Sequence, residues 1–408
     1  PSRGLLYHRL AAYLPSLLPG VQKALLDGSY RPGNIRRAWI PKPDGSKRGL
    51  GIPNVVDRMV QQAVYQVMGP HYEPTFHPRS HGFRPARSCH TAIDQAKKDL
   101  AEGYAWVVDI DLEKFFDRVH HERLLSRLAQ RVKDERLLTL IRRMLKAKVV
   151  MPDGVVVRTE EGTPQGGPLS PLLSNIVLDE LDWELERRGH RFVRYADDCN
   201  VYVKTERAGL RVMESLKVYL ERRLRLRINI QKSQVARPEE RHFLGFRLQT
   251  QGEAAPAVRL SRRSLERIEE KLRELTPRNW GRKKGEAIKR LNAYLSGWIG
   301  FFWICTEEET STFRRLDAHL RRRLRATLLK QWKRERTIVR RLVALKVPSD
   351  MARKSLHAGA RGTWSRSRTP GVHRGLSNRY FQRLGLKSIT DTWTEKRLFE
   401  AGPARLQP

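Results

Sequence analysis

The chain of 408 residues is long enough for two or three domains with a substantial core. Its formal net charge of +36 and its pI of about 10.8 indicate a polyanionic partner, usually nucleic acid, although solubility or membrane-surface binding is an alternative. The three cysteines lie far apart, and no apolar run approaches the roughly 18 residues of a membrane span. A disulfide framework, a Cys-x-x-Cys zinc module and a membrane-spanning protein are therefore not expected.

The first half of the chain alternates between strand-like and helical patterns. Residues 38–53 predict a strand, a turn and a second strand, because Pro-Asp-Gly supplies turn chemistry between two apolar runs. Interleaved strands and helices continue to about residue 248, which indicates a mixed α/β region. The other elements expected here are helices at 5–26, 57–68 and 121–128, a buried strand at 105–110 and a hairpin at 149–157.

Residues 192–203 predict a β-hairpin that carries carboxylates at its turn. Two runs of β-forming residues, 192–195 and 200–203, flank Ala196, Asp197 and Asp198. A pair of aspartates often marks an ordinary turn, so this pattern alone is weak evidence for a site.

After residue 251 the sequence becomes helical and strongly basic. An apolar stripe recurs at every fourth residue, which is typical of a helix with one buried face: Leu316, Leu320, Leu324, Leu328 and Trp332. The basic residues around the stripe indicate nucleic-acid contact, with a solvated helix face as the alternative. The candidate contact residues are Arg321, Arg322, Arg325, Lys330 and Lys333. From about residue 348 the chain is rich in Gly, Ser and Arg, and a short helix is expected near Tyr380.

Three carboxylates could serve a metal-dependent polymerase. Nucleotidyl transfer uses two divalent cations about 3.5–4 Å apart, and Mg²⁺ prefers carboxylate oxygens together with substrate phosphates. Asp111 ends the strand-like run 107–111, while Asp197 and Asp198 lie at the hairpin turn. Acidic residues on adjacent strands would meet this requirement.

Several blocks, in order, resemble motifs of the reverse transcriptase–maturase proteins encoded by group II introns. Tyr-Ala-Asp-Asp at 195–198 resembles the Tyr-x-Asp-Asp box of reverse transcriptases, and 111–117 resembles the preceding metal-binding motif. Three further blocks are similar to motifs of this family: 80–88, 162–171 and 243–246. The resemblance covers nearly the whole chain, since three later segments resemble the thumb, or maturase, domain that retroviral-type enzymes lack: 291–302, 330–333 and 362–386.

The resemblance implies an α/β (α+β) right-hand polymerase. Fingers and palm with a mixed sheet are expected over residues 1–250, and an all-helical thumb, or maturase (X), domain over 251–345. A small basic tail that binds nucleic acid is expected over 346–408. Three scattered cysteines do not suggest a zinc-type endonuclease module. In this respect the chain resembles bacterial family members that lack a C-terminal endonuclease domain.

The resemblance also implies a catalytic role for several residues. Asp111, Asp197 and Asp198 would hold two Mg²⁺ ions, or Mn²⁺, roughly 3.5–4 Å apart. Asp109 lies on the same strand face as Asp111 but is expected to be structural. Lys232 matches the family lysine proposed to protonate the leaving pyrophosphate, a role that suits the shiftable pKa of lysine.

A nucleotide pocket is implied in the same way. Lys42 and Arg48 match the family pair that binds the triphosphate, with solvated hairpin charges as the alternative. Gln165 and the backbone of Gly166 would line the sugar and base, because glycine allows a close approach. Phe116 would exclude a 2′-hydroxyl, unless it is simply a core residue.

The expected function is RNA-directed DNA polymerase. It would use an RNA template with a DNA primer and deoxynucleoside triphosphates, in the bacterial cytoplasm or nucleoid. Binding of folded group II intron RNA and target DNA would assist splicing and retrohoming. One alternative is a domesticated relative in DNA repair, phage defence or spacer acquisition. A second is a non-catalytic RNA-binding splicing factor, against which the intact carboxylates argue.

Overall fold

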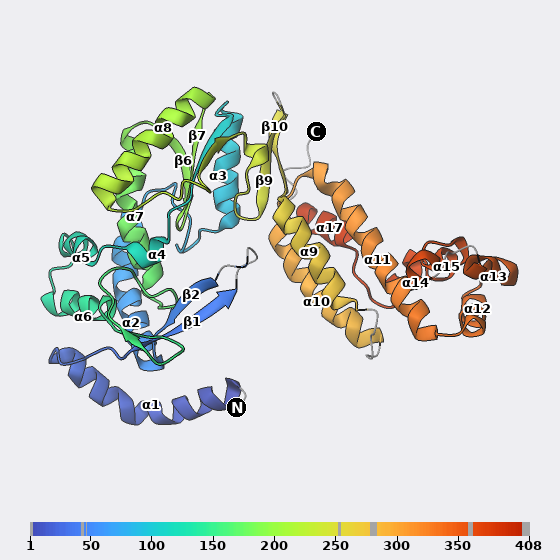
Figure 1. The fold of residues 1–408 in the computed structure, drawn as a ribbon, viewed down its shortest axis with the longest axis horizontal. Helices are drawn as coiled ribbons and strands as arrows, with labels where there is room; N and C mark the ends of the chain where they lie inside the picture. Colours follow the sequence, from blue (N-terminus) through green and yellow to red (C-terminus); the bar gives the residue numbers. More distant parts are fainter. Residues whose placement is uncertain are drawn as a thin grey trace. The chain divides into compact units, whose positions relative to one another are not determined.

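The computed structural model describes residues 3–41, 45, 47–251, 254–277, 284–357 and 362–401. The chain forms two compact units, Pro1–Arg237 and Pro238–Pro408. Figure 1 draws the first unit in blue to yellow-green and the second in yellow to red. Each unit buries its own set of apolar side chains.

The first unit contains a small mixed sheet with strand order β2-β1-β4-β5. Its strands are β1 (Ile35–Pro41), β2 (Lys47–Ile52), β4 (Val149–Val150) and β5 (Val156–Val157). β1 runs antiparallel to β2 and parallel to β4. The structure confirms the hairpin predicted at 149–157, in which Gly154 adopts a φ of +89° that glycine tolerates easily.

The second sheet of this unit is antiparallel and has strand order β6-β7-β3-β8. Its strands are β3 (Trp106–Ile110), β6 (Arg191–Tyr195), β7 (Asp198–Val203) and β8 (Gln234–Ala236). The predicted carboxylate hairpin is confirmed, because β6 and β7 pair directly and residues 196–197 connect them. β7 also pairs with β3, so two segments far apart in sequence meet in one sheet.

Some helices of the first unit pack against this sheet. The helices of the unit are α1 (Arg3–Leu26), α2 (Val55–Tyr72), α3 (Cys89–Ala101), α4 (Phe115–Arg118), α5 (His121–Ala129), α6 (Glu135–Leu145), α7 (Ser170–Arg187) and α8 (Glu206–Tyr219). α3 and α7 contact β6, whereas α8 contacts β3 and β7 (Figure 1). α7 is buried along most of its length, because apolar residues occupy several of its faces.

The second unit begins with a β-hairpin, β9 (Phe246–Gln251) and β10 (Ala254–Leu260), and continues as helices. Its first helices are α9 (Arg262–Leu275), α10 (Lys284–Phe302), α11 (Thr310–Trp332) and α12 (Glu335–Ala344). The predicted apolar stripe of α11 is confirmed as core, because each of its members is buried. The two units together have the predicted fold, a mixed α/β region followed by a helical one.

The segment expected as a basic tail is helical over most of its described part. It contains α13 (Ser349–His357), α14 (Thr363–Arg366), α15 (Pro370–Gly375), α16 (Asn378–Arg383) and α17 (Ile389–Ala401). Leu376, Phe381 and Trp393 anchor these helices, since each is at most 3% exposed. The short helix predicted near Tyr380 is α16.

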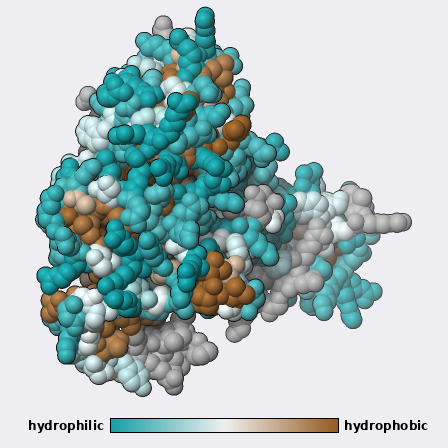
Figure 2. Space-filling view, turned by 60° about the vertical axis from the view of Figure 1, so that its left-hand side comes forward, coloured by the Kyte–Doolittle hydropathy of each residue, from teal (hydrophilic) through white to brown (hydrophobic). Residues whose placement is uncertain are grey.

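None of the described helices combines the length and the hydropathy that crossing a membrane would require. Figure 2 shows a face on which hydrophilic residues predominate and hydrophobic residues form separate patches.

Candidate active site

The three predicted carboxylates come from neighbouring strands. Tyr195 of β6 pairs with Asp198 of β7, and Ile110 of β3 pairs with Cys199 of β7. Asp111 follows Ile110 directly, so it lies beside residues 195–198, which we call the carboxylate turn. Antiparallel pairing thus brings together acidic side chains that are more than 80 residues apart in sequence.

The carboxylates influence one another electrostatically. Desolvation by surrounding atoms, with repulsion from Asp197, Asp109 and Asp111, raises the pKa of Asp198 to about 7, although the side chain reaches solvent. Desolvation also raises the pKa of Asp197, and Asp111 adds to this effect. Lys232 acts in the opposite direction on Asp198. A divalent cation would relieve this repulsion and allow the cluster to ionise.

The donor set suits a magnesium ion whose coordination shell is completed by the substrate. Within the described ranges, no three His, Cys, Asp or Glu side chains already converge as a metal-binding group. Mg²⁺ in nucleotide-processing sites commonly binds through one or two carboxylates plus substrate phosphates and water. Asp111 and Asp197, with Asp198 adjacent, fit that pattern.

Lys232 lies next to Asp111, with its Nζ 3.9 Å from Oδ2 of the aspartate. The backbone explains this proximity. Asn229 N donates to the Asp111 carbonyl at 2.8 Å, and Asp111 N donates to Ser233 Oγ at 2.9 Å. The loop carrying Lys232 is thus bonded on both sides to the end of β3. Ser233 was not predicted as a site residue, since only the fold brings it to Asp111.

Arg48, Gln165 and Gly166, which are expected to belong to a nucleotide pocket, lie close together. Arg48 Nε donates to Gln165 Oε1 at 2.8 Å, and Gly51 N donates to the Gln165 carbonyl at 3.0 Å. Gly166 has a φ of +135°, and a Cβ there would come within 2.9 Å of the Gly51 carbonyl oxygen. Glycine is therefore required for this close approach. Lys42 lies outside the described residues.

Phe116 is buried and touches both the core and the nucleotide loop. Its ring meets that of Phe115 edge to face at 5.2 Å, and its side chain is 7% exposed. Its carbonyl accepts a hydrogen bond from Thr163 N at 2.6 Å, two residues before Gln165. The core interpretation and the sugar-selection interpretation both fit this position.

The basic residues of α11 have different environments. Arg322 lies over the Trp364 ring at 3.8 Å, and Arg321 Nη1 is 3.9 Å from Asp317 Oδ1. Lys330 and Lys333 are exposed at the end of the helix.

Arg325 requires a correction. It was predicted to contact nucleic acid, but its side chain is buried, and its Nε donates to the Leu376 carbonyl at 2.8 Å. The C-terminal helices cover this side of α11, so Arg325 holds the protein's own backbone.

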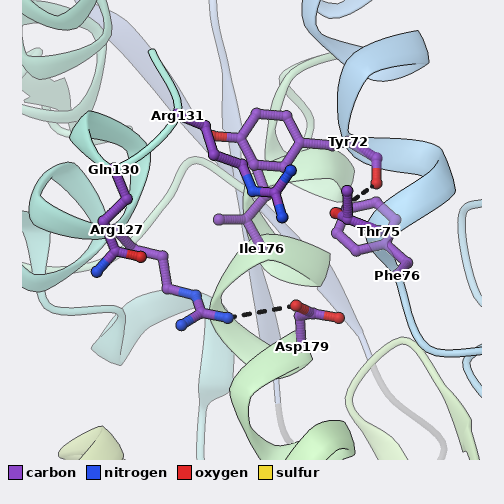
Figure 3. Close-up of a pocket in the computed structure, with 8 residues that line it drawn as sticks. All are labelled: Tyr72, Thr75, Phe76, Arg127, Gln130, Arg131, Ile176 and Asp179. Atoms are coloured by element: carbon purple, nitrogen blue, oxygen red, sulfur yellow. Dashed lines mark hydrogen bonds and ion pairs between the residues drawn. The ribbon is translucent and has the colours of Figure 1, made fainter. Parts of the chain in front are cut away.

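Other residues of the first unit line a small pocket (Figure 3). Its lining comes from α7, from the ends of α2 and α5 and from the residues that follow these two helices: Tyr72, Thr75, Phe76, Arg127, Gln130, Arg131, Ile176 and Asp179. Arg127 Nη2 donates to Asp179 Oδ2 at 3.3 Å across it. None of the predicted catalytic residues lines this pocket, so the carboxylate turn remains the candidate active site.

Two family models match parts of this chain. Residues 40–248 match the family described as "Reverse transcriptase (RNA-dependent DNA polymerase)", and residues 265–343 match "Group II intron, maturase-specific domain". Protein YkfC of Escherichia coli (strain K12) is 35% identical over 286 residues, covering 60% of this chain and 74% of that protein.

A second relative is the group II intron-encoded protein LtrA of Lactococcus lactis subsp. cremoris. It is 29% identical over 332 residues, covering 65% of this chain and 55% of LtrA. The chain thus spans about half the length of LtrA. Among solved structures, apo telomerase from Candida tropicalis aligns with a TM-score of 0.48 and 11% identity, covering 92% of this chain and 66% of that one. From the family matches, the chain belongs to the reverse transcriptase family and carries the group II intron maturase-specific domain.

Proposed function

We propose that this protein is an RNA-directed DNA polymerase that also binds group II intron RNA. The observation that carries the proposal is the meeting of Asp111 with the carboxylate turn at the paired ends of β3, β6 and β7, within the reverse transcriptase match. The substrates would be an RNA template with a DNA primer and deoxynucleoside triphosphates. Folded intron RNA and target DNA would be further partners, through the maturase-specific domain.

In this proposal the primer 3′-hydroxyl attacks the α-phosphate of the incoming nucleotide, and pyrophosphate leaves. Asp111, Asp197 and Asp198 would hold Mg²⁺, which supplies activation of the hydroxyl and charge stabilisation on the phosphates. Arg48 would bind the triphosphate. Lys232, beside Asp111, would give its proton to the leaving pyrophosphate.

Primer extension tests the polymerase directly. The purified chain should add deoxynucleotides to a DNA primer on an RNA template when Mg²⁺ or Mn²⁺ is supplied, and chelation of the metal should stop synthesis. Binding to folded group II intron RNA should exceed binding to an unstructured RNA of the same length. Failure to extend with either metal would contradict the polymerase, and equal binding to both RNAs would contradict the maturase role.

Sugar selection depends on Phe116 in this proposal. The variant Phe116→Ala should raise the ratio of ribonucleotide to deoxynucleotide incorporation efficiency by roughly tenfold or more, because it opens space beside the 2′-carbon. Phe115→Ala is the matched control, since Phe115 is also buried and contacts the same ring. If both variants leave the ratio unchanged, Phe116 is a core residue only.

Salt dependence tests the exposed end of α11. The double variant Lys330→Gln/Lys333→Gln should bind template–primer more weakly and make the log–log salt dependence shallower by about 1–2, because each phosphate contact contributes about 0.9 on duplex DNA. Arg207→Gln/Arg211→Gln on α8 removes the same charge from exposed positions of the first unit and is the control. Equal slopes for the two double variants would mean that this end of α11 is only a solvated surface.

A further inference from the structure

Arg194 is the largest side chain that the described part of the chain buries completely. It lies on β6, immediately before the carboxylate turn, and its side chain is 0% exposed. Its Nε and Nη2 donate to the two oxygens of Asp182 on α7, at 2.7 and 2.5 Å. A buried guanidinium needs such a partner, because removing an unpaired charge from water costs on the order of several kcal/mol.

The remaining donors of Arg194 reach groups that an ion pair alone would not need. Nη1 donates to Asn175 Oδ1 at 3.0 Å and to the Ala196 carbonyl at 2.9 Å. Nη2 also donates to Ser80 Oγ at 2.7 Å. Every N–H of the guanidinium therefore meets an acceptor, and one of these acceptors belongs to the carboxylate turn.

Ala196 has a backbone conformation that needs support. Its φ is +57°, in the left-handed region, which costs a residue with a Cβ roughly 1 kcal/mol or more. The bond from Arg194 fixes the carbonyl of this strained residue. Asp197 follows Ala196 directly, so the direction of its carboxylate depends on the conformation held there.

A second segment supports the turn from the other side. A Cβ on Gly82 would lie 2.1 Å from the Ala196 nitrogen, so the two backbones are in direct contact. Asn175 Nδ2 donates to the Gly82 carbonyl at 2.9 Å, and His81 N donates to the Arg194 carbonyl at 2.8 Å. Asn175 thus joins Arg194 and Gly82 through opposite ends of one amide.

We infer that Arg194, fixed by Asp182 and Asn175, is a positioning residue that sets the carboxylate turn in the geometry needed for metal binding and nucleotidyl transfer. The inference rests on the proposed polymerase function. Stability alone does not require this ion pair, since well-packed apolar pairs often replace buried salt bridges without loss. The bond to the Ala196 carbonyl is the contribution that an apolar pair cannot make. Lysine cannot make it while satisfying the other acceptors, because its ammonium lacks the planar fork of donors.

The test uses two variants and a matched control. Arg194→Met/Asp182→Leu removes both buried charges and keeps an apolar interior, while Arg194→Lys keeps the charge opposite Asp182. The control is Arg79→Lys, because Arg79 also pairs with a buried aspartate, Asp99, but reaches β6 at the Phe192 carbonyl, away from the turn. Each protein is assayed for kcat and KM in primer extension, for Mn²⁺ affinity by electron paramagnetic resonance, and for thermal unfolding.

We expect both Arg194 variants to lose about 10- to 100-fold in kcat or in Mn²⁺ affinity, as is typical when residues supporting metal ligands are changed. The KM for template–primer should change little. Arg79→Lys should lose comparable stability but keep its Mn²⁺ affinity. If the double variant does not fold, the kcat and the Mn²⁺ affinity of Arg194→Lys test the inference on their own.

A folded Arg194 variant with wild-type kcat and Mn²⁺ affinity would overturn the inference, as would an equal loss of Mn²⁺ affinity in Arg79→Lys. Failure of the proposed function has a different signature. In that case the wild-type chain itself would not extend primers.

Discussion

The variant Asp197→Asn should lose DNA synthesis by a factor of about 10³ or more and remain folded. An amide cannot hold a divalent cation as a carboxylate does, and the charge stabilisation that such a cation provides is worth several kcal/mol, at about 1.4 kcal/mol per tenfold in rate. Stability should not fall, because the change removes one charge from a cluster whose members raise one another's pKa. The measurements are primer extension and thermal unfolding on the same preparation.

The control for this variant is Asp94→Asn, which neutralises an exposed carboxylate on α3 of the same unit. It should keep full activity. Binding of structured RNA should survive in both variants, since the basic residues are unchanged. Near-normal synthesis by Asp197→Asn would remove the carboxylate turn from the mechanism.

The variant Asp317→Ala should destabilise the second unit by about 2–4 kcal/mol, because hydrogen bonds to a charged group are strong and their loss leaves buried donors unsatisfied. Asp317 of α11 accepts bonds from Ile389 N and Thr390 N at 2.8 and 3.0 Å. It also accepts from the hydroxyls of Ser388 and Thr390, both at 2.9 Å. The side chain thus caps the start of α17 from a helix about 70 residues earlier in the chain.

Denaturant unfolding of Asp317→Ala measures this loss, and hydrogen exchange should show faster exchange of amides in α17 than elsewhere in the unit. Asp391→Ala changes an exposed aspartate in the first turn of the same helix and should cost well under 1 kcal/mol. Similar losses in the two variants would show that the cap from α11 contributes little.

Local patterns predicted much of the fold and the core of the candidate site. The hairpin of β6 and β7 follows from strand-forming runs around a short polar turn, and two of the predicted carboxylates lie within the same segment, residues 191–203. The α11 stripe is likewise a local signal, since helical spacing places its leucines on one face.

Contacts between distant segments could not be predicted in this way. Nothing near Ser233 in sequence indicates that its hydroxyl binds the backbone of Asp111. The sequence around Arg325 is typical of a solvated arginine. The helices that cover it, α15 and α16, come from residues about 50 positions later in the chain. Arg194 is similar, because its distant acceptors come from two separate segments of the chain, α7 and the segment around Ser80.

The bonds between Asp111 and Ser233 also bear on when the site can first exist during protein synthesis. The two residues are 122 positions apart. At about 5–20 residues per second, a ribosome takes roughly 6 to 24 seconds to travel between them. β7 is made late in that interval and β8 only after it, so β3 first lacks both of its neighbouring strands and then lacks β8. A nascent chain released before residue 233 would lack the hydroxyl that accepts a hydrogen bond from the backbone of Asp111.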